Sequence, residues 1–169
     1  MRVLIALDDS EQAQGVVTAL APWLRRAEAD VHLVSVVDMS QVRQAAMAGE
    51  PFYQPSPGVG TRPAIQQPPP RAVESHGQAL ERARTEREEA LLGLVKGELE
   101  GLNVQVHVLS DDETAEAIAN YGPEVGADVI AVGTHGRSGL TRALMGSVAE
   151  QVVRLSELPV IVVREGMHT

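Results

Sequence analysis

Residues 128–147 read DVIAVGTHGRSGLTRALMGS and combine a predicted strand with a loop rich in glycine. The run 129–132 is apolar throughout, which is typical of a central strand covered by helices on both faces. Gly133, Gly136 and Gly139 follow it within seven residues, so this loop permits positive φ angles and a close approach of a ligand to backbone amides. The stretch therefore favours an α/β fold with a binding site after this strand.

The same alternation of strand and helix patterns extends along the chain. Apolar, β-rich runs predict strands at 2–7, 31–37, 103–109, 128–132 and 159–163. Apolar residues at helical spacing predict helices at 11–27, 76–100, near 114–121 and at about 140–157. Strands that alternate with helices imply a parallel sheet. Strict polar–apolar alternation in the third run indicates an edge strand, and the last run is a candidate for the opposite edge.

The chain has 169 residues, which fits a single domain over residues 1–169. Seven of its ten prolines lie within residues 49–70, together with three glycines. Such a composition does not support a helix or a strand. We therefore expect a mobile, Pro/Gly-rich insertion at about 39–74, between the second strand and the next helix.

Composition excludes several classes of function. The net charge is −9 and aromatic residues make up 2% of the chain, which argues against general nucleic-acid binding. The chain has no cysteine for a disulfide or a zinc thiolate, and its one lysine, Lys96, lies outside any GxxxxGK[ST] loop. No run is long enough to span a membrane and the N-terminus does not resemble a signal peptide, so we expect a cytoplasmic protein without membrane contact.

Ligands of open α/β sheets bind beyond the carboxyl ends of the strands. Asp8 follows the first strand, and Arg137 adds a positive charge to the glycine loop after the fourth. Ser147 and Glu150 have the spacing of a capping box, and a helix that starts there would direct its first amides toward an anion. The alternative is that the glycines only form turns and Ser147 only caps a helix.

The spacing of these residues resembles a known family. Gly133, Gly136 and the pair Gly146-Ser147 match the GxxG-x9-G[ST] signature of the universal stress protein family. Asp8-x-Ser10 after the first strand and the apolar run that closes the chain also resemble that family. The resemblance covers residues 1–38 and about 75–164.

This resemblance implies an α/β fold with an open, five-stranded parallel sheet in the order 3-2-1-4-5 and helices on both faces, as in Rossmann-like proteins. It also implies ATP or AMP as the ligand, with magnesium as a candidate companion. Asp8 would contact the nucleoside, and Val36 or Val37 would meet the adenine. The site implied by the resemblance and by the strand ends comprises Ala6, Leu7, Asp8, Val36, Val37, Val132, Gly133, His135, Gly136, Arg137, Gly146, Ser147 and Val148.

The expected function is that of a nucleotide-dependent sensor or switch in the stress response, with at most slow ATP hydrolysis. The resemblance implies a homodimer through the last strand, at Val160, Ile161, Val162 and Val163. Asp112 and Thr114 stand where many members have Gly and Pro. The added acid would either weaken phosphate binding or help to hold magnesium, and the sequence leaves both open.

Two other functions remain as alternatives. The first is a dimeric interaction module of the same fold that binds no nucleotide. The second is a phosphoacceptor receiver-like domain. The acidic pair Asp8 and Asp9, then Asp111 or Asp112, and Thr134 would be suitable for it, although Arg164 stands where a receiver needs a lysine. His32 and His107 fall on predicted strands, where they are expected to be structural or solvated.

Overall fold

The computed structural model describes residues 1–8, 12–48, 75–134 and 145–164. The strands are β1 (Arg2–Ala6), β2 (Asp30–Asp38), β3 (Asn103–Asp111), β4 (Val129–Gly133) and β5 (Val160–Val163). The helices are α1 (Gln12–Arg26), α2 (Met39–Ala48), α3 (His76–Gly97), α4 (Thr114–Glu124) and α5 (Ser147–Leu155). Among the described residues no helix is both long and apolar enough to cross a membrane.

The five strands form one parallel sheet in the order β3-β2-β1-β4-β5, which confirms the predicted topology. Ala6 at the end of β1 pairs with Val34 on β2 and with Val132 on β4. The chain leaves β1 toward one side of the sheet and β4 toward the other, so their adjacent carboxyl ends form the topological switch point. Ligands of open α/β folds bind at this point.

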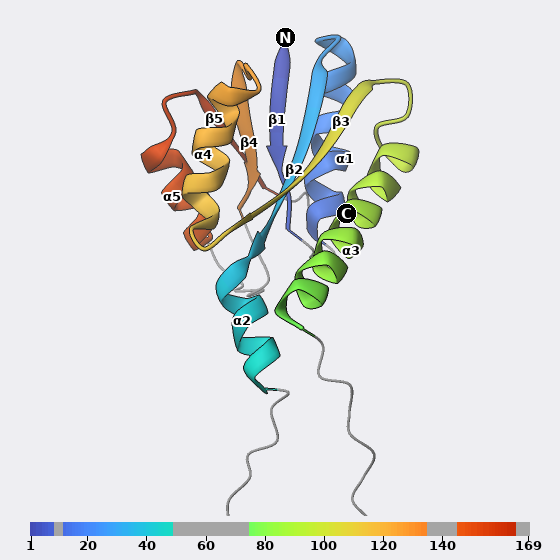
Figure 1. The fold of residues 1–169 in the computed structure, drawn as a ribbon. Helices are drawn as coiled ribbons and strands as arrows, with labels where there is room; N and C mark the ends of the chain where they lie inside the picture. The colour runs from blue at the N-terminus through green and yellow to red at the C-terminus, as the bar shows by residue number, and fades with distance from the viewer. Residues whose placement is uncertain (9–11, 49–74, 135–144, 165–169) are drawn as a thin grey trace, which may run out of the picture.

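Helices cover both faces of the sheet, with α1 and α3 on one face and α4 and α5 on the other (Figure 1). Successive strand residues point to opposite faces of the sheet. Because helices bury both faces, the inner strands are nearly all aliphatic. Val3 and Ile5 are fully buried on the α1–α3 face, and Leu4 is fully buried on the α4–α5 face. A strand buried on both faces explains the continuous apolar run at the start of the chain.

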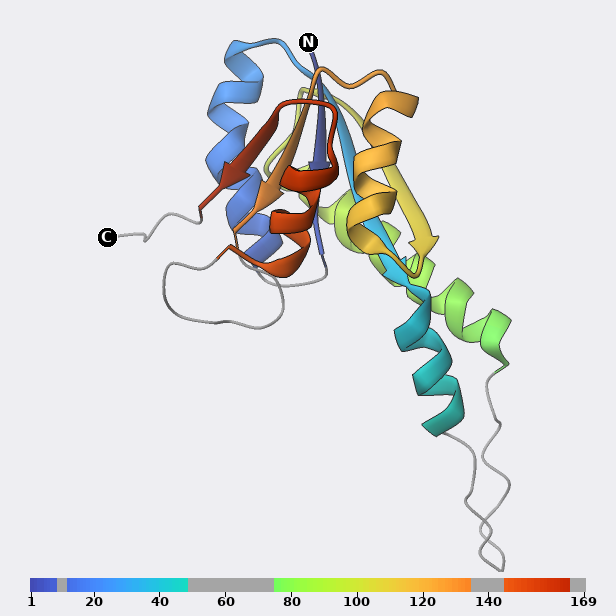
Figure 2. The ribbon, with the colours of Figure 1, turned by 90° about the vertical axis from the view of Figure 1, so that its left-hand side faces the viewer.

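Residues 39–48, which the sequence analysis assigned to the insertion, form helix α2. Val42 of this helix packs with Val37 and Ala79 in a small buried cluster apart from the two main cores. As a result, α2 and the beginning of α3 lie side by side and extend past the carboxyl edge of the sheet (Figure 2). The expectation of a mobile segment at 49–74 concerns residues outside the described part of the chain.

Candidate functional site

A cavity of about 420 Å³ opens at the carboxyl edge of the sheet, around the switch point between β1 and β4. Strand ends contribute Ala6, Leu7, Asp8, Val36, Asp38, Val132 and Gly133 to its lining. The helices contribute Gln41 of α2, Arg87 of α3, Thr114 and Ile118 of α4, and Ser147, Val148 and Ala149 of α5. Most elements of the fold therefore meet at this one cavity.

Part of the cavity wall is aliphatic and buried. Val36, Ile118 and Val132 are between 3% and 6% exposed, and Ala149 is 4% exposed. These side chains belong to the core cluster between the sheet and helices α4 and α5, so the cavity is a continuation of that core. An apolar, flat group of a ligand would lose its contact with water against this wall, which is favourable.

Two helices begin at the cavity. Thr114 is the first residue of α4 and Ser147 is the first residue of α5, and both line it. Neither N-cap residue, Glu113 or Gly146, forms a side-chain hydrogen bond to its helix. First-turn amides at such ends have no intrahelical acceptor and carry the positive end of the helix dipole. The arrangement therefore offers hydrogen-bond donors to an anionic group.

The capping role predicted for Ser147 is wrong. The N-cap of α5 is Gly146, whose backbone is extended at φ −61° and ψ 152°. Ser147 already has a helical backbone, so its side chain is not placed to accept from the third amide of the helix. The Gly146 amide donates to the Thr134 carbonyl at 2.8 Å, which ties the start of α5 to the end of β4. Ser147 instead lines the cavity.

Arg87 brings a guanidinium group to the cavity from α3. Its Nη1 donates to Ser35 Oγ at 2.7 Å and approaches the Val36 carbonyl at 3.5 Å. Ser35 is only 2% exposed, so this hydrogen bond satisfies a hydroxyl that is buried in the sheet. Arg87 was not among the site residues expected from the sequence. The sequence did contain a sign of its role, because Arg87 is a charged residue at a position of α3 where the helical spacing predicts an apolar side chain.

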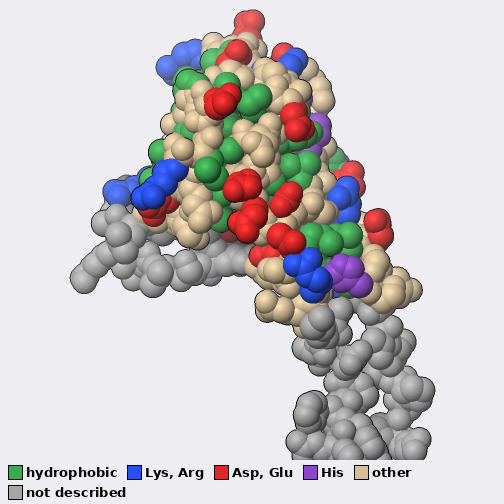
Figure 3. Space-filling view, turned by 60° about the vertical axis from the view of Figure 1, so that its left-hand side comes forward, with side chains coloured by type: hydrophobic (Ala, Val, Ile, Leu, Met, Phe, Trp, Pro, Cys, Tyr) green, Lys and Arg blue, Asp and Glu red, His purple; other side chains and the backbone are tan. Residues whose placement is uncertain are grey.

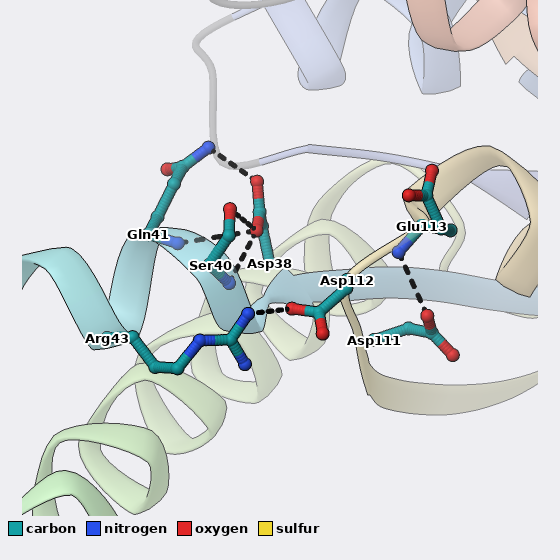
Figure 4. Close-up of polar contacts among 7 residues, drawn as sticks. All are labelled: Asp38, Ser40, Gln41, Arg43, Asp111, Asp112 and Glu113. Atoms are coloured by element: carbon teal, nitrogen blue, oxygen red, sulfur yellow. Dashed lines mark hydrogen bonds and ion pairs between the residues drawn. The ribbon is translucent and has the colours of Figure 1, made fainter.

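Asp38 ends β2 and caps α2. Its Oδ1 accepts from the backbone N–H groups of Ser40 and Gln41 at 2.9 and 3.3 Å, and its Oδ2 accepts from Gln41 Nε2 at 2.9 Å (Figure 4). The Ser40 hydroxyl, which also donates to Asp38, is the main reason why the pKa of this carboxyl lies below its usual value, while burial opposes the shift. Asp38 is therefore an ionised helix cap at the rim of the cavity.

Asp112 and Thr114, the two departures from the family pattern, have different environments. Asp112 Oδ1 lies 2.6 Å from Arg43 Nη2 of α2 (Figure 4). Thr114 lines the cavity at the start of α4. Among the described residues, no three histidine or acidic side chains are grouped as metal ligands. The Asp112 carboxylate is thus engaged by an arginine.

The structure brings most of the described candidate residues together. Those that line the cavity are Ala6, Leu7, Asp8, Val36, Val132, Gly133, Ser147 and Val148. Val37 does not line it, because its side chain points to the opposite face of the sheet and packs with Val42 and Ala79. Gly146 is present as the cap of α5, outside the lining. His135, Gly136 and Arg137 lie outside the described residues.

Further lining residues were absent from the expected site: Asp38, Gln41, Arg87, Thr114, Ile118 and Ala149. Gln41 lies in the segment that was expected to be a mobile insertion. Ile118 and Ala149 occupy the inward faces of α4 and α5. Their apolar character is compatible with core positions anywhere in the fold, so only their position in space identifies them as cavity residues.

Acidic side chains gather on the face of the molecule that carries α4 (Figure 3). Asp111, Asp112, Glu113 and Glu116 are all exposed around the start of this helix. A polyanion such as a nucleic acid would be repelled by this face. These carboxylates also reduce the attraction of the α4 N-terminus for a phosphate, so the first turn of α5 is the more favourable anion site.

Comparison with known proteins agrees with the fold. Residues 59–164 match the model of the Universal stress protein family. The universal stress protein MJ0577 of Methanocaldococcus jannaschii is 32% identical over 95 residues, which are 56% of this chain and 59% of that protein. A solved structure of MJ0577 superposes with a TM-score of 0.71 at 20% identity, covering 98% of this chain and 96% of that one.

Two similar folds were solved with a nucleotide. One is the universal stress protein from Archaeoglobus fulgidus in complex with dAMP, with a TM-score of 0.56, 21% identity and 96% coverage of both chains. Another is a universal stress protein in complex with cAMP, with a TM-score of 0.52, 17% identity and 98% coverage of both chains. The family model matches more than half of this chain, and the sheet has the order 3-2-1-4-5 that the resemblance to the family implies. This chain therefore belongs to the universal stress protein family.

Proposed function

We propose that this protein binds an adenine nucleotide, ATP or AMP, in the cavity at the switch point and acts in the cytoplasm as a nucleotide-dependent sensor or switch of the stress response. The observation that carries the proposal is the meeting of two helix N-termini, at Thr114 and Ser147, beside a buried aliphatic wall. The helix N-termini suit a phosphate group, and the aliphatic wall suits an adenine base. The dAMP and cAMP complexes of related proteins support the same ligand class.

The cavity has room for such a ligand in a defined orientation. Its volume of about 420 Å³ falls within the range that is usual for small-molecule sites. Phosphates would lie at the end formed by Gly133 and the first turn of α5, where backbone amides are available. The base would lie against Val36 at the end of β2. The Asp8 carboxylate, between these two ends, would accept hydrogen bonds from ribose hydroxyls.

Magnesium would accompany ATP as a phosphate-bound ion. Mg²⁺ is usually held by one or two carboxylates together with substrate phosphates and water. Asp8, which lines the cavity just after β1, would supply such a carboxylate. When bound, the ion would neutralise charge on the triphosphate. We propose at most slow hydrolysis, so binding, and not turnover, would carry the signal.

The proposal is tested by placing a negative charge at the phosphate end of the cavity. Val148 lies in the first turn of α5, lines the cavity and is 39% exposed. A glutamate there is favourable for the helix dipole, so Val148→Glu should leave the stability unchanged or slightly raised. Its charge should weaken ATP binding about tenfold to hundredfold, or about 1.4–2.8 kcal/mol. Calorimetric titration of the nucleotide-stripped protein measures this loss.

Three comparisons make the titration specific. Val148→Gln has a similar size without the charge and should bind ATP nearly as well as the wild type. Gln151→Glu adds the same charge to an exposed position of α5 that does not line the cavity, and should have little effect. Adenosine, which has no phosphate, should lose much less affinity than ATP in Val148→Glu. No binding to the wild type at millimolar ATP would favour the interaction module without nucleotide.

We also propose that the protein is a homodimer through β5. This strand is one edge of the sheet, so one side of its backbone has no neighbouring strand within the described part of the chain. Val162 is 37% exposed on it, and Val153 and Leu155 of α5 are 43% and 48% exposed nearby in sequence. An apolar edge strand favours pairing with a second copy of the same chain.

A further inference from the structure

Two histidines form a pair on the sheet, away from the cavity. His32 on β2 and His107 on β3 share the face that α4 covers, and His32 Nδ1 lies 3.1 Å from His107 Nε2. The ring planes are within 7° of each other. This geometry fits an N–H···N hydrogen bond in which one imidazole donates and the other accepts. The bond needs a lone pair on one nitrogen, so it exists only while at least one ring is neutral.

The pair is shielded from water. His32 is 5% exposed, His107 is partly buried, and Tyr121 of α4 meets the His107 ring at 5.3 Å and 65°. Burial of the pair disfavours a charged imidazole, and for this reason the pKa of each histidine is lowered.

Charged groups from the surrounding elements act on the pair as well. For His32, the charge of His107 and then that of Arg2 on β1 lower the pKa further, while Asp30 on β2 raises it. On α4, burial and then the charge of Glu124 raise the pKa of Tyr121, so this phenol stays neutral at physiological pH. The positive charge of Arg2 and the loss of hydration thus disfavour protonation of the pair, whereas the Asp30 carboxylate favours it.

The pair lies between β2 and the edge strand β3, which are also paired along their whole length. β3 is an edge strand and pairs only with β2 among the described strands. Tyr121 extends the contact to α4, whose other end contributes Thr114 and Ile118 to the cavity. One cluster, made of the His32–His107 hydrogen bond and the His107–Tyr121 ring contact, therefore connects β2, the edge strand and the helix that forms a wall of the cavity.

We propose that the His32–His107 pair is an acid-sensitive latch, in which protonation of both imidazoles breaks their hydrogen bond and loosens β3 and α4 from the sheet. Two protons from solvent enter the pair, and no lone pair is then left to accept between the rings. The two positive rings repel each other across 3.1 Å. The latch follows from these side chains alone and does not depend on nucleotide binding.

The direction of the pH effect follows from the lowered pKa values. Below the ordinary histidine pKa of about 6.5, the unfolded chain binds protons that the folded pair refuses. The contribution of the pair to stability is therefore complete above this pH and is lost as the pH falls below it. Each refused proton raises the unfolding equilibrium constant up to about tenfold per pH unit, so two protons raise it up to about a hundredfold.

The test is urea unfolding of the wild type and of the double variant His32→Leu/His107→Leu between pH 7.5 and pH 5. The wild type should lose stability steeply below pH 6.5, and the double variant should lose most of that slope. His76→Gln, at an exposed position of α3, is the matched control and should keep the wild-type slope. An equal slope in the wild type and in a folded double variant would overturn the proposal.

A second measurement applies even if the double variant does not fold. In the wild type, ¹⁵N imidazole spectra should show that His32 Nδ1 and His107 Nε2 share one proton at neutral pH. Hydrogen exchange, corrected for its intrinsic pH dependence, should speed up in β3 and α4 at pH 5 before it does so in β1. Independent titration of both rings near pH 6.5, with uniform exchange across the sheet, would contradict the latch.

Discussion

Arg43 Nη2 lies 2.6 Å from Asp112 Oδ1, and this ion pair joins α2 to the loop between β3 and α4. Gln41 and Thr114, each two residues away from one of the partners, line the cavity. The pair therefore links α2 to the segment that leads into α4, and both contribute residues to the cavity lining (Figure 4). The side chains are 46% and 53% exposed, so water and salt reach them.

We expect this ion pair to contribute little to stability. A double-mutant cycle of Arg43→Gln and Asp112→Asn should give a coupling of about 0.2–1 kcal/mol in urea unfolding, as is usual for exposed pairs. The coupling should shrink in 1 M salt because salt screens exposed charges. Glu150 and Arg154, an exposed i,i+4 pair at 2.7 Å on α5, provide a reference cycle of similar size.

The same variant distinguishes the two roles that the sequence leaves open for Asp112. If the carboxylate is occupied by Arg43, Asp112→Asn should leave the magnesium dependence of ATP affinity unchanged. The measurement is a calorimetric titration with ATP at several magnesium concentrations. A loss of that dependence would instead make Asp112 a metal-binding residue.

Arg87→Leu should destabilise the protein by about 1–3 kcal/mol, because it leaves the buried Ser35 hydroxyl without the guanidinium that now donates to it. Urea unfolding at pH 7.5 measures the change. Lys96→Leu removes a positive charge from an exposed position of the same helix and should change the stability by less than about 0.5 kcal/mol. Combining Arg87→Leu with Ser35→Ala should recover part of the loss, since both polar partners are then removed. Equal effects of Arg87→Leu and Lys96→Leu would contradict this account.

Asp38→Ala should fray α2, because it removes the carboxylate that accepts from the Ser40 and Gln41 amides. Loss of such a cap costs about 0.5–2 kcal/mol. The readout is hydrogen exchange of the α2 amides, which should become faster while those of α4 stay unchanged.

The cap also has a defined pH dependence. The pKa of Asp38 is lowered in the folded state, so its stabilising effect is present above the ordinary value of 3.8 and disappears as the pH falls through the lower, folded value. Acid should therefore fray α2 in the wild type and add nothing in Asp38→Ala. Equal acid sensitivity of the α2 amides in both proteins would argue against the cap.

Val162→Asp should weaken the proposed dimer, because pairing through β5 would bury the new carboxylate at the edge. The dimer dissociation constant should rise by at least about tenfold, or about 1.4 kcal/mol. Light scattering over a dilution series measures the mass. Gln105→Asp places the same charge at an exposed position of β3, the opposite edge, and should leave the dimer mass unchanged. A monomeric wild type would refute the dimer itself.

Much of the fold was predictable from local patterns. The apolar runs and the helical spacing of the sequence locate all five strands and α1, α3 and α4 to within a few residues. These signals are local, because burial on one or two faces imposes a period of 3.6 or 2 on the sequence. Helix α2 was not predicted. It packs only a small cluster around Val42, and it ends next to a segment rich in proline.

The candidate site was predictable where a residue's place along a strand end or helix start decides its position. Asp8, Val36 and Gly133 meet at the cavity because they lie at or near the carboxyl ends of three parallel strands. Val37 does not line the cavity, because one step along a strand reverses the direction of the side chain. Arg87 was missed because its role depends on Ser35, which is 52 residues earlier in the chain.

The sequence by itself determined the α/β class and the edge character of β3, because each depends on neighbours within a few residues. The resemblance to the universal stress proteins supplied the sheet order. Only the tertiary structure decided which side chains share the cavity, that Asp112 faces Arg43, and that His32 and His107 share a hydrogen bond. These are contacts between residues 69 and 75 positions apart. Such contacts depend on register and helix placement, which no local pattern encodes.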